Sequence, residues 1–234
     1  MAITASMVKE LREMTGAGMM DCKKALTATE GDMDKAVDFL REKGLAGAQK
    51  KAGRIAAEGI VATCISEDEK HAVVVEVNAE TDFVAKNEKF KTYVAEVAAQ
   101  AVNTQAEDIE GFMAEKWALD PSMTVKEKLS SMISIIGENM NIRRFAKVSE
   151  ENGIVVSYIH AGGKIGVLVD VETDVVNDAI KEMAKNVAMQ AAALKPQYTT
   201  RAEVDADYIS REKEILLAQI MNDPKAVSYT HLRA

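Results

Sequence analysis

The stretch Gly59-Ile-Val-Ala-Thr-Cys-Ile-Ser66, with His71-Ala-Val-Val-Val-Glu-Val77 after it, decides the fold because it occurs twice. It returns 94 residues later as Gly153-Ile-Val-Val-Ser-Tyr-Ile-His160, with Ile165-Gly-Val-Leu-Val-Asp-Val171 after it. In each copy apolar and polar residues alternate on both sides of a short polar turn, which is typical of a β-hairpin. The sequence therefore predicts two related hairpins in one chain.

A helix is expected after each hairpin, over residues 87–102 in the first copy and 175–193 in the second. The two helices align at an offset of 90 residues rather than 94, so the first copy has four more residues between strand and helix. These residues fall within 78–87. Binding residues concentrate on loops that a rigid scaffold holds, and the fold itself does not need the added length. We therefore expect the longer connection to carry function.

The longer connection contains Thr81, Asp82, Phe83 and Val84. Large apolar side chains are more often buried than exposed, so Phe83 could pack into the protein's own core. A phenylalanine on an added loop could also be exposed for a partner. From the residues alone, both interpretations of Phe83 stay open.

The chain before the repeat has a different composition. Residues 1–54 hold ten Lys or Arg and eight Asp or Glu, a net charge of +2, whereas the other 180 residues carry −10. Helical spacing of apolar residues predicts three short helices here, with Thr4 capping the first and Gly44 ending the third. Residues 45–54, which are small, polar and basic, are expected to form a hinge or linker. Met19 and Met20 could be core residues or an adaptable contact surface.

The rest of the chain fits an α+β fold with antiparallel sheets. Helices are expected over residues 108–115, 124–136 and 202–220, and a strand over 141–148. Thr124 and Glu127 predict a capping box at the start of the second of these helices. We expect these domains: a three-helix docking module and linker over 1–54, a first core half over 55–140, a second and incomplete half over 141–222, and an irregular tail over 223–234.

Composition excludes several classes of protein. The net charge of −8 disfavours a nucleic-acid backbone as the main partner. No stretch is long and apolar enough to predict a membrane helix, and the N-terminus lacks the pattern of a signal peptide. The two cysteines, Cys22 and Cys64, form neither a metal motif nor a disulfide framework. A cytoplasmic protein is therefore expected, with no direct contact to nucleic acid or membrane.

The sequence contains none of the common motifs of phosphate, dinucleotide or metal binding. The glycine-rich run Gly162-Gly-Lys-Ile-Gly166 occupies a predicted hairpin turn rather than a phosphate-binding loop. His71, His160 and His231 lack the spacing of metal ligands. The sequence therefore predicts a protein that is not an enzyme and needs no cofactor or metal. It leaves the oligomeric state open.

Three stretches make the chain resemble the elongation factor Ts family, the guanine-nucleotide exchange factors of bacterial translation. The first is residues 3–26, ITASMVKELREMTGAGMMDCKKAL, and the second is residues 77–87, VNAETDFVAKN. The third is residues 136–144, IGENMNIRR, together with 157–160 and 164–168. The resemblance runs from about residue 2 to about residue 222. It implies an N-terminal module similar to ubiquitin-associated domains, followed by a core of two related halves.

The resemblance also implies a partner, elongation factor Tu, whose release of GDP the protein would promote. Thr81, Asp82, Phe83 and Val84 would then displace Mg²⁺ from that GTPase. The module would dock on the GTPase domain. His160, expected in the turn after the first strand of the second copy, would contact elongation factor Tu outside that domain. The docking residues of the module would be Arg12, Met19 and Met20, with Val8 and Leu11 as further candidates.

Two other functions remain open at this point. A docking scaffold without exchange activity would bind the GTPase but leave GDP release unchanged. An enzyme of an unrecognised type would use the neighbourhood of Asp82 or His160. Family members usually continue with a coiled-coil hairpin and a final segment, so we expect a C-terminally shortened member whose second sheet has an unpaired edge.

Overall fold

The structure is a computed structural model that describes residues 3–222. The expected irregular tail over 223–234 lies outside the described residues. The chain divides into two compact units, residues 1–193 and residues 194–234. The domain boundaries expected from the sequence remain predictions.

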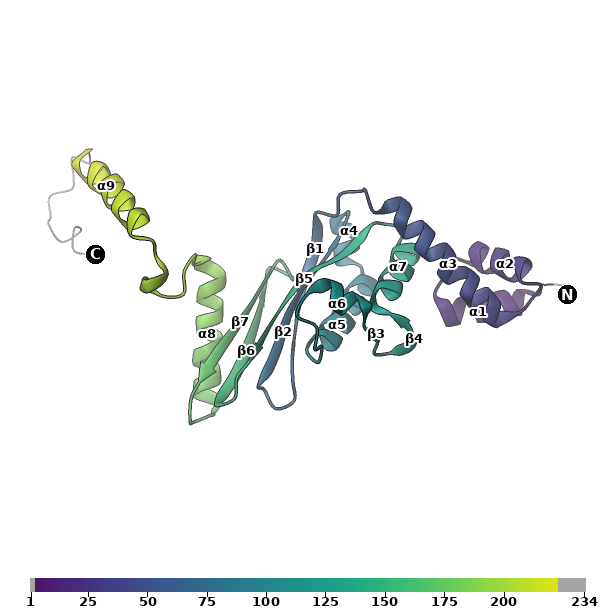
Figure 1. The fold of residues 1–234 in the computed structure, drawn as a ribbon, viewed down its shortest axis with the longest axis horizontal. Coiled ribbons are helices and arrows are strands. Elements are labelled where there is room, and N and C mark those ends of the chain that lie inside the picture. The colour runs from purple at the N-terminus through teal and green to yellow at the C-terminus, as the bar shows by residue number, and fades with distance from the viewer. Residues whose placement is uncertain (1–2, 223–234) are drawn as a thin grey trace. The chain divides into compact units, whose positions relative to one another are not determined.

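Three helices begin the first unit, as the sequence predicted (Figure 1). Thr4 caps the first by accepting a hydrogen bond from the Met7 amide, and Asp32 caps the third by accepting one from the Lys35 amide. Their apolar faces form a small separate core that includes Leu11, Cys22 and Leu26. The helices are α1 (Ala5–Thr15), α2 (Met19–Ala28) and α3 (Met33–Lys51).

The third helix corrects one prediction. Gly44 does not end it, because α3 continues to Lys51 and takes up most of the expected linker over residues 45–54. A Cβ atom at Gly44 would lie 3.8 Å from the Ser130 carbonyl oxygen on α7 (Val125–Ile136). Helices approach one another closely where side chains are small. Gly44 is therefore a packing residue, at which α3 rests against α7 of the core.

The first hairpin belongs to a three-stranded antiparallel sheet. Its strands are β1 (Glu58–Ile65) and β2 (His71–Ala79), and β5 (Met140–Ser149) pairs with the other edge of β2. Helix α5 (Glu88–Ala101) packs on one face of this sheet. The sequence grouped β5 with the second half, but its pairing joins it to the first. The buried side chains that β2 contributes to this core are Val73, Val75, Val77 and Ala79.

A short hairpin that the sequence did not reveal lies between the helices of this core. It consists of β3 (Lys116–Trp117) and β4 (Asp120–Thr124), and it follows α6 (Ile109–Ala114). The Trp117 side chain is almost fully buried in the core. At the start of α7, Thr124 and Glu127 form the predicted capping box.

The second hairpin, of β6 (Gly153–His160) and β7 (Ile165–Glu172), has the same strand register as the first. Gly59 pairs with Asn78 and Gly153 with Glu172, so the equivalent residues of the two copies pair identically. A Cβ at Gly59 or Gly153 would lie 2.2 or 1.8 Å from a carbonyl oxygen of the partner strand. Both copies therefore require glycine at this position.

The two hairpins pack face to face. Helices α5, α6 and α7 lie on one side of the three-stranded sheet, and the β6–β7 hairpin lies on the other (Figure 1). The Val61 amide donates to the Gly163 carbonyl at 2.7 Å, and the Val155 amide donates to the Glu69 carbonyl at 2.8 Å. These two bonds are equivalent under the repeat. The turn of each hairpin thus binds the first strand of the other.

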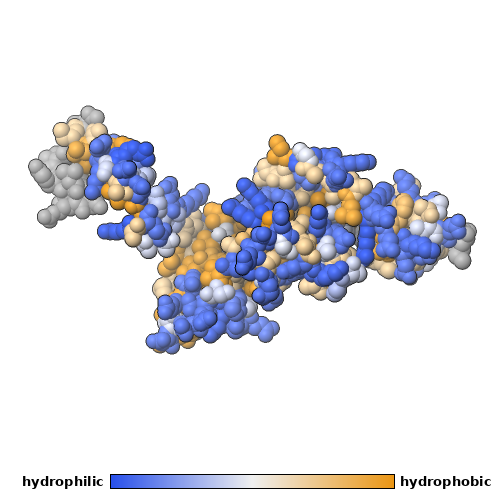
Figure 2. Space-filling view, viewed as in Figure 1, coloured by the Kyte–Doolittle hydropathy of each residue, from blue (hydrophilic) through white to orange (hydrophobic). Residues whose placement is uncertain are grey.

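Helix α8 (Asp178–Leu194) follows the second hairpin, starting three residues later than predicted. Ala184, Ala188 and Ala192 form its buried stripe. Met183 and Val187 are about half exposed. Figure 2 shows an apolar surface in the region of β7 and α8, whereas the three N-terminal helices are mostly hydrophilic. The surface around β7 and α8 is thus more apolar than that of the three N-terminal helices in this view.

The described part of the second unit contains a short 3₁₀ helix, Arg201–Glu203, and helix α9 (Ala206–Asn222). Asp205 accepts hydrogen bonds from the Asp207 and Tyr208 amides, so it caps the start of α9. The predicted helix over 202–220 therefore begins four residues later. The architecture as a whole confirms the α+β class.

Candidate functional site

The longer connection of the first repeat forms a short helix directly after β2. Thr81 caps this helix, α4 (Asp82–Lys86), because its hydroxyl oxygen accepts a hydrogen bond from the Val84 amide at 3.4 Å. Asn87 ends α4 and caps α5 through a bond from the Lys89 amide. The extra residues are therefore an ordered turn of helix between two caps.

The Phe83 ring lies on the outside of α4. The residue is 82% exposed, which settles the open question from the sequence against a place in the core. Ala85 is buried, and Val84 packs partly against the core on the opposite side of the turn. Loops held by a rigid scaffold often carry binding residues, and this exposed ring is available for contact with another molecule.

Asp82 is held by an ion pair within α4. The Lys86 ammonium lies 2.7 Å from its carboxylate. The hydrogen bond that Lys86 donates to Asp82 holds the pKa of Asp82 below its ordinary value, and the same bond raises the pKa of Lys86. Asp82 is therefore ionised at neutral pH, and its ion-pair partner is the exposed Lys86.

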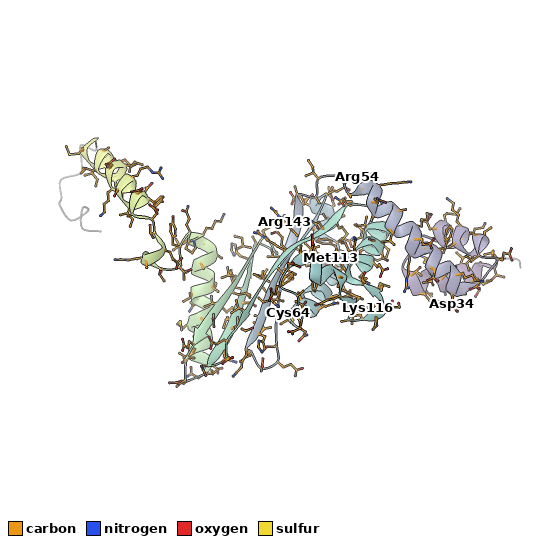
Figure 3. The ribbon with its side chains drawn as sticks, in the orientation of Figure 1. Asp34, Arg54, Cys64, Met113, Lys116 and Arg143 are labelled. Carbon is orange, nitrogen blue, oxygen red and sulfur yellow. The ribbon has the colours of Figure 1, made fainter. Side chains whose placement is uncertain are left out.

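Two glutamates tie this loop to the connection between α7 and β5. Glu138 accepts hydrogen bonds from the Thr81 amide at 3.0 Å and from the Thr81 hydroxyl at 2.7 Å. In return, Glu80 accepts one from the Asn139 amide at 2.5 Å. The Asn139 side chain also donates to the Arg54 carbonyl at 2.7 Å. Figure 3 labels Arg54 beyond the end of α3.

Sequence reasoning missed Glu138 and Asn139. The motif IGENMNIRR contains both residues, but their partners lie 57 to 85 residues away in the chain. The one local signal is Gly137, which ends α7 with a φ of +90° and so predicts a turn at this place.

The candidate docking residues of the module fall into two groups. Met19 and Met20 are 58% and 63% exposed, and Arg12 is also exposed, so all three are available to a partner. Val8 and Leu11 are buried in the module's own core. These two residues can support the docking surface by holding α1 in place, but they offer little surface of their own.

His160 is exposed at the last position of β6, rather than in the turn after it. Its Nδ1 lies 2.9 Å from the Tyr158 hydroxyl oxygen, and the centroids of the two rings are 5.8 Å apart. The candidate residues thus occupy three separate places, which are α4, the surface of α1 and α2, and the end of β6. No hydrogen bond or ion pair described for residues 3–222 joins these places.

The cysteines and the other possible metal ligands of the described residues do not form a reactive site. Within 3–222 no group of three or more His, Cys, Asp or Glu side chains is arranged to hold a metal ion. Cys22 is fully buried, and burial raises the pKa of its thiol. It therefore behaves as a small apolar core residue. In the same part of the chain, no helix combines the length and apolar character that crossing a membrane requires.

Comparison with known proteins decides the family. A family model described as Elongation factor TS matches residues 80–230, a range that begins at the α4 loop. An elongation factor Ts from Clostridium tetani is 56% identical over 223 residues, which cover 95% of this chain and 73% of that relative. This chain belongs to the elongation factor Ts family. Elongation factor Ts proteins from Clostridium novyi and Clostridioides difficile match with the same coverage, at 52% and 55% identity.

Membership of the elongation factor Ts family assigns the chain a role in translation elongation. The relatives match over both the three N-terminal helices and the core, because the matched residues make up 95% of the chain. The same match spans 73% of the relatives' length.

Proposed function

We propose that this protein is a guanine-nucleotide exchange factor that binds elongation factor Tu with GDP bound and speeds the release of the GDP. The observation that carries the proposal is the 82% exposure of Phe83 on a helix whose other side is anchored in the core. A free aromatic ring on an ordered loop suits insertion into a partner better than any internal packing role. The family resemblance gives this loop the role of displacing Mg²⁺ from the GTPase.

The physical basis of exchange is linkage between two ligands of one protein. In a GTPase, Mg²⁺ and the phosphates hold the switch segments in one arrangement. Phe83 would occupy space that is open only in another arrangement, and binding energy spent there favours the nucleotide-free state. By reciprocity, bound GDP weakens binding of the exchange factor by the same factor. No covalent step is needed, so the proposed protein acts without being an enzyme.

Asp82 has an electrostatic role in this proposal. Its carboxylate is ionised and exposed, and Lys86 is its partner in the free protein. In the complex the carboxylate can accept hydrogen bonds from the partner near the metal site. Thr81 and Val84 set the geometry, one as the helix cap and the other as an anchor in the core.

The module and the second half would enlarge the interface. Arg12, Met19 and Met20 form the docking surface on the module, and methionines adapt well to a partner's shape. His160 supplies a separate contact from the end of β6. Contacts spread over separate places suit a partner that has several domains. We expect the complex to form in the cytoplasm, where translation takes place.

A GDP-release assay tests the function. Elongation factor Tu is loaded with fluorescent GDP and chased with unlabelled GDP, with this protein at a small fraction of the GTPase concentration. The proposal predicts release that speeds up in proportion to the protein added, with many turnovers per molecule. The alternative, a docking scaffold, predicts binding by calorimetry with an unchanged release rate, and that result would refute exchange activity.

A further inference from the structure

We propose that Glu138 is a positioning residue for exchange, which holds the α4 loop so that Phe83 faces the partner. This inference rests on the proposed exchange function. It concerns a residue 55 positions away from Phe83 in the sequence, on the turn that joins α7 to β5.

The loop needs an external constraint because α4 is only five residues long. Helices this short do not hold themselves in water, because nucleation is unfavourable and few backbone bonds form. The buried Ala85 anchors one side of the turn, but Asp82 and Phe83 project away from the core. The direction of Phe83 therefore depends on what fixes the start of the helix, which is Thr81.

Glu138 fixes Thr81 through both of its donors. One carboxylate oxygen lies 3.0 Å from the Thr81 amide, and the other lies 2.7 Å from the Thr81 hydroxyl. Since the hydroxyl proton points to Glu138, a lone pair of the same oxygen is left for the Val84 amide at 3.4 Å. A hydroxyl that donates in one direction and accepts in another is fixed in its rotamer. Glu138 thus orients the cap that starts α4.

The reciprocal bond from Asn139 to Glu80 strengthens this arrangement. Glu80 and Thr81 precede the helix, while Glu138 and Asn139 precede β5, and each pair supplies one carboxylate to the other. Arg54 also lies 3.5 Å from the Glu80 carboxylate. Two connections that are far apart in the chain therefore hold one another, and the loop is fixed from both sides.

The chain offers a matched control at the start of α7, the helix whose end Glu138 follows. Glu127 accepts hydrogen bonds from the Thr124 amide at 2.6 Å and the Thr124 hydroxyl at 3.1 Å, which is the same chemistry that Glu138 provides for Thr81. Glu127 caps α7 and does not contact the α4 loop. Removing either carboxylate costs stability, but only Glu138 is expected to affect exchange.

The experiment compares Glu138→Ala, Glu138→Gln and Glu127→Ala with the wild type. Melting curves report folding, and GDP release from elongation factor Tu is measured at saturating concentrations of each protein. Glu138→Ala is expected to slow release about tenfold, which is less than the roughly 100-fold that a 1 Å misplacement of a reacting group can cost, because the Phe83 ring itself remains. Glu138→Gln, which keeps one acceptor, should lie between Glu138→Ala and the wild type and covers the case that the alanine variant fails to fold. Glu127→Ala should release GDP at the wild-type rate.

A double variant tests whether Glu138 acts through Phe83. If it does, GDP release with the double variant Phe83→Ala/Glu138→Ala should be no slower than with Phe83→Ala alone, because the ring that Glu138 positions is absent from both. The inference would be overturned if the double variant slowed release by the product of the two single effects. Equal release rates for Glu138→Ala and Glu127→Ala would overturn it as well. If the wild type itself fails to speed release, the proposed function falls and takes this inference with it. If the wild type speeds GDP release and Phe83→Ala slows it, both as proposed, release at the wild-type rate with Glu138→Ala would overturn this inference and leave the proposed function standing.

Discussion

The hydroxyl oxygens of Thr63 and Ser157 lie 3.1 Å apart, and the two residues occupy the same position in the two copies of the repeat. A residue that touches its own equivalent lies next to a local two-fold axis. The equivalent backbone bonds from Val61 to Gly163 and from Val155 to Glu69 agree with such an axis. The two hairpins thus pack as a pseudo-symmetric pair, although their sequences differ at many positions.

Thr63 and Ser157 should show coupled effects on stability. Thr63→Val or Ser157→Ala alone leaves one partly buried hydroxyl without its partner, at a cost of about 1 kcal/mol in the free energy of unfolding. The double variant removes both groups, so its cost should be smaller than the sum of the two. Urea denaturation of the four proteins measures this coupling. Strictly additive effects would mean that the hydroxyls do not interact.

Tyr93 in the first core should tolerate loss of its hydroxyl. Its ring is buried beside Trp117, with centroids 6.1 Å apart, and within the described residues its hydroxyl has no hydrogen-bond partner. Burial raises the pKa of this hydroxyl far above its ordinary value, so it stays neutral. Tyr93→Phe is expected to raise the free energy of unfolding by about 1 kcal/mol, because an unsatisfied polar group is removed. A clear loss of stability would reveal a partner for the hydroxyl.

Glu76 should make stability depend on pH in the acidic range. Arg143 and Arg144 on β5, the first of which Figure 3 labels, lie 3.1 and 2.7 Å from its carboxylate. Burial opposes ionisation of Glu76, but the bond from Arg144 and that from Asn78 outweigh it and lower the pKa. A lowered pKa in the folded state means stability that is present above the unfolded pKa and lost as pH falls through the folded pKa.

The test for Glu76 compares wild type with Glu76→Gln by chemical denaturation. At pH 7 the wild type should be more stable by about 1 kcal/mol, a modest value because both arginines are mostly exposed. The difference should shrink as the pH falls below about 4.5, where carboxylates begin to protonate. A difference that is the same at both ends of this range would rule out the ionic contribution.

Met19 and Met20 should contribute to binding and not to folding. Both are more than half exposed, so the double variant Met19→Ala/Met20→Ala loses little packing in the free protein. We expect an unchanged melting curve and an affinity for elongation factor Tu that falls about tenfold or more, as for moderate interface contacts. Met183→Ala, at an exposed methionine on α8, serves as the control and should bind normally. Equal affinities for the two variants would remove the methionine pair from the interface.

Local chemistry explains why much of the fold could be predicted. Thr4, Asp32 and Thr124 cap helices because each side chain accepts a hydrogen bond from the amide three residues on, and this pattern is visible in the sequence. The repeat predicted both hairpins and located the α4 loop, since a four-residue difference needs no knowledge of packing. Exposure of Phe83 could not be predicted in this way, because it depends on the direction in which α4 points.

Long-range packing explains the errors. Glycine ends many helices, yet α3 continues past Gly44 because α7 packs against it there. The pairing of β5 with β2 joins residues some 70 positions apart, which periodicity cannot show. Glu138 and Asn139 belong to the same class, since their partners are distant in sequence. A local pattern predicts an element, but not the neighbour of that element.

The rate of GDP release from elongation factor Tu, measured for Phe83→Ala beside the wild type, tests the central claim most directly. The melting curve of the free variant is recorded with it. Because Phe83 is 82% exposed, the melting curve should not change. Release should slow by about 30-fold or more, which corresponds to the ~2 kcal/mol or more of an interface hot spot. Release at the wild-type rate, or a collapsed melting curve, would contradict the account.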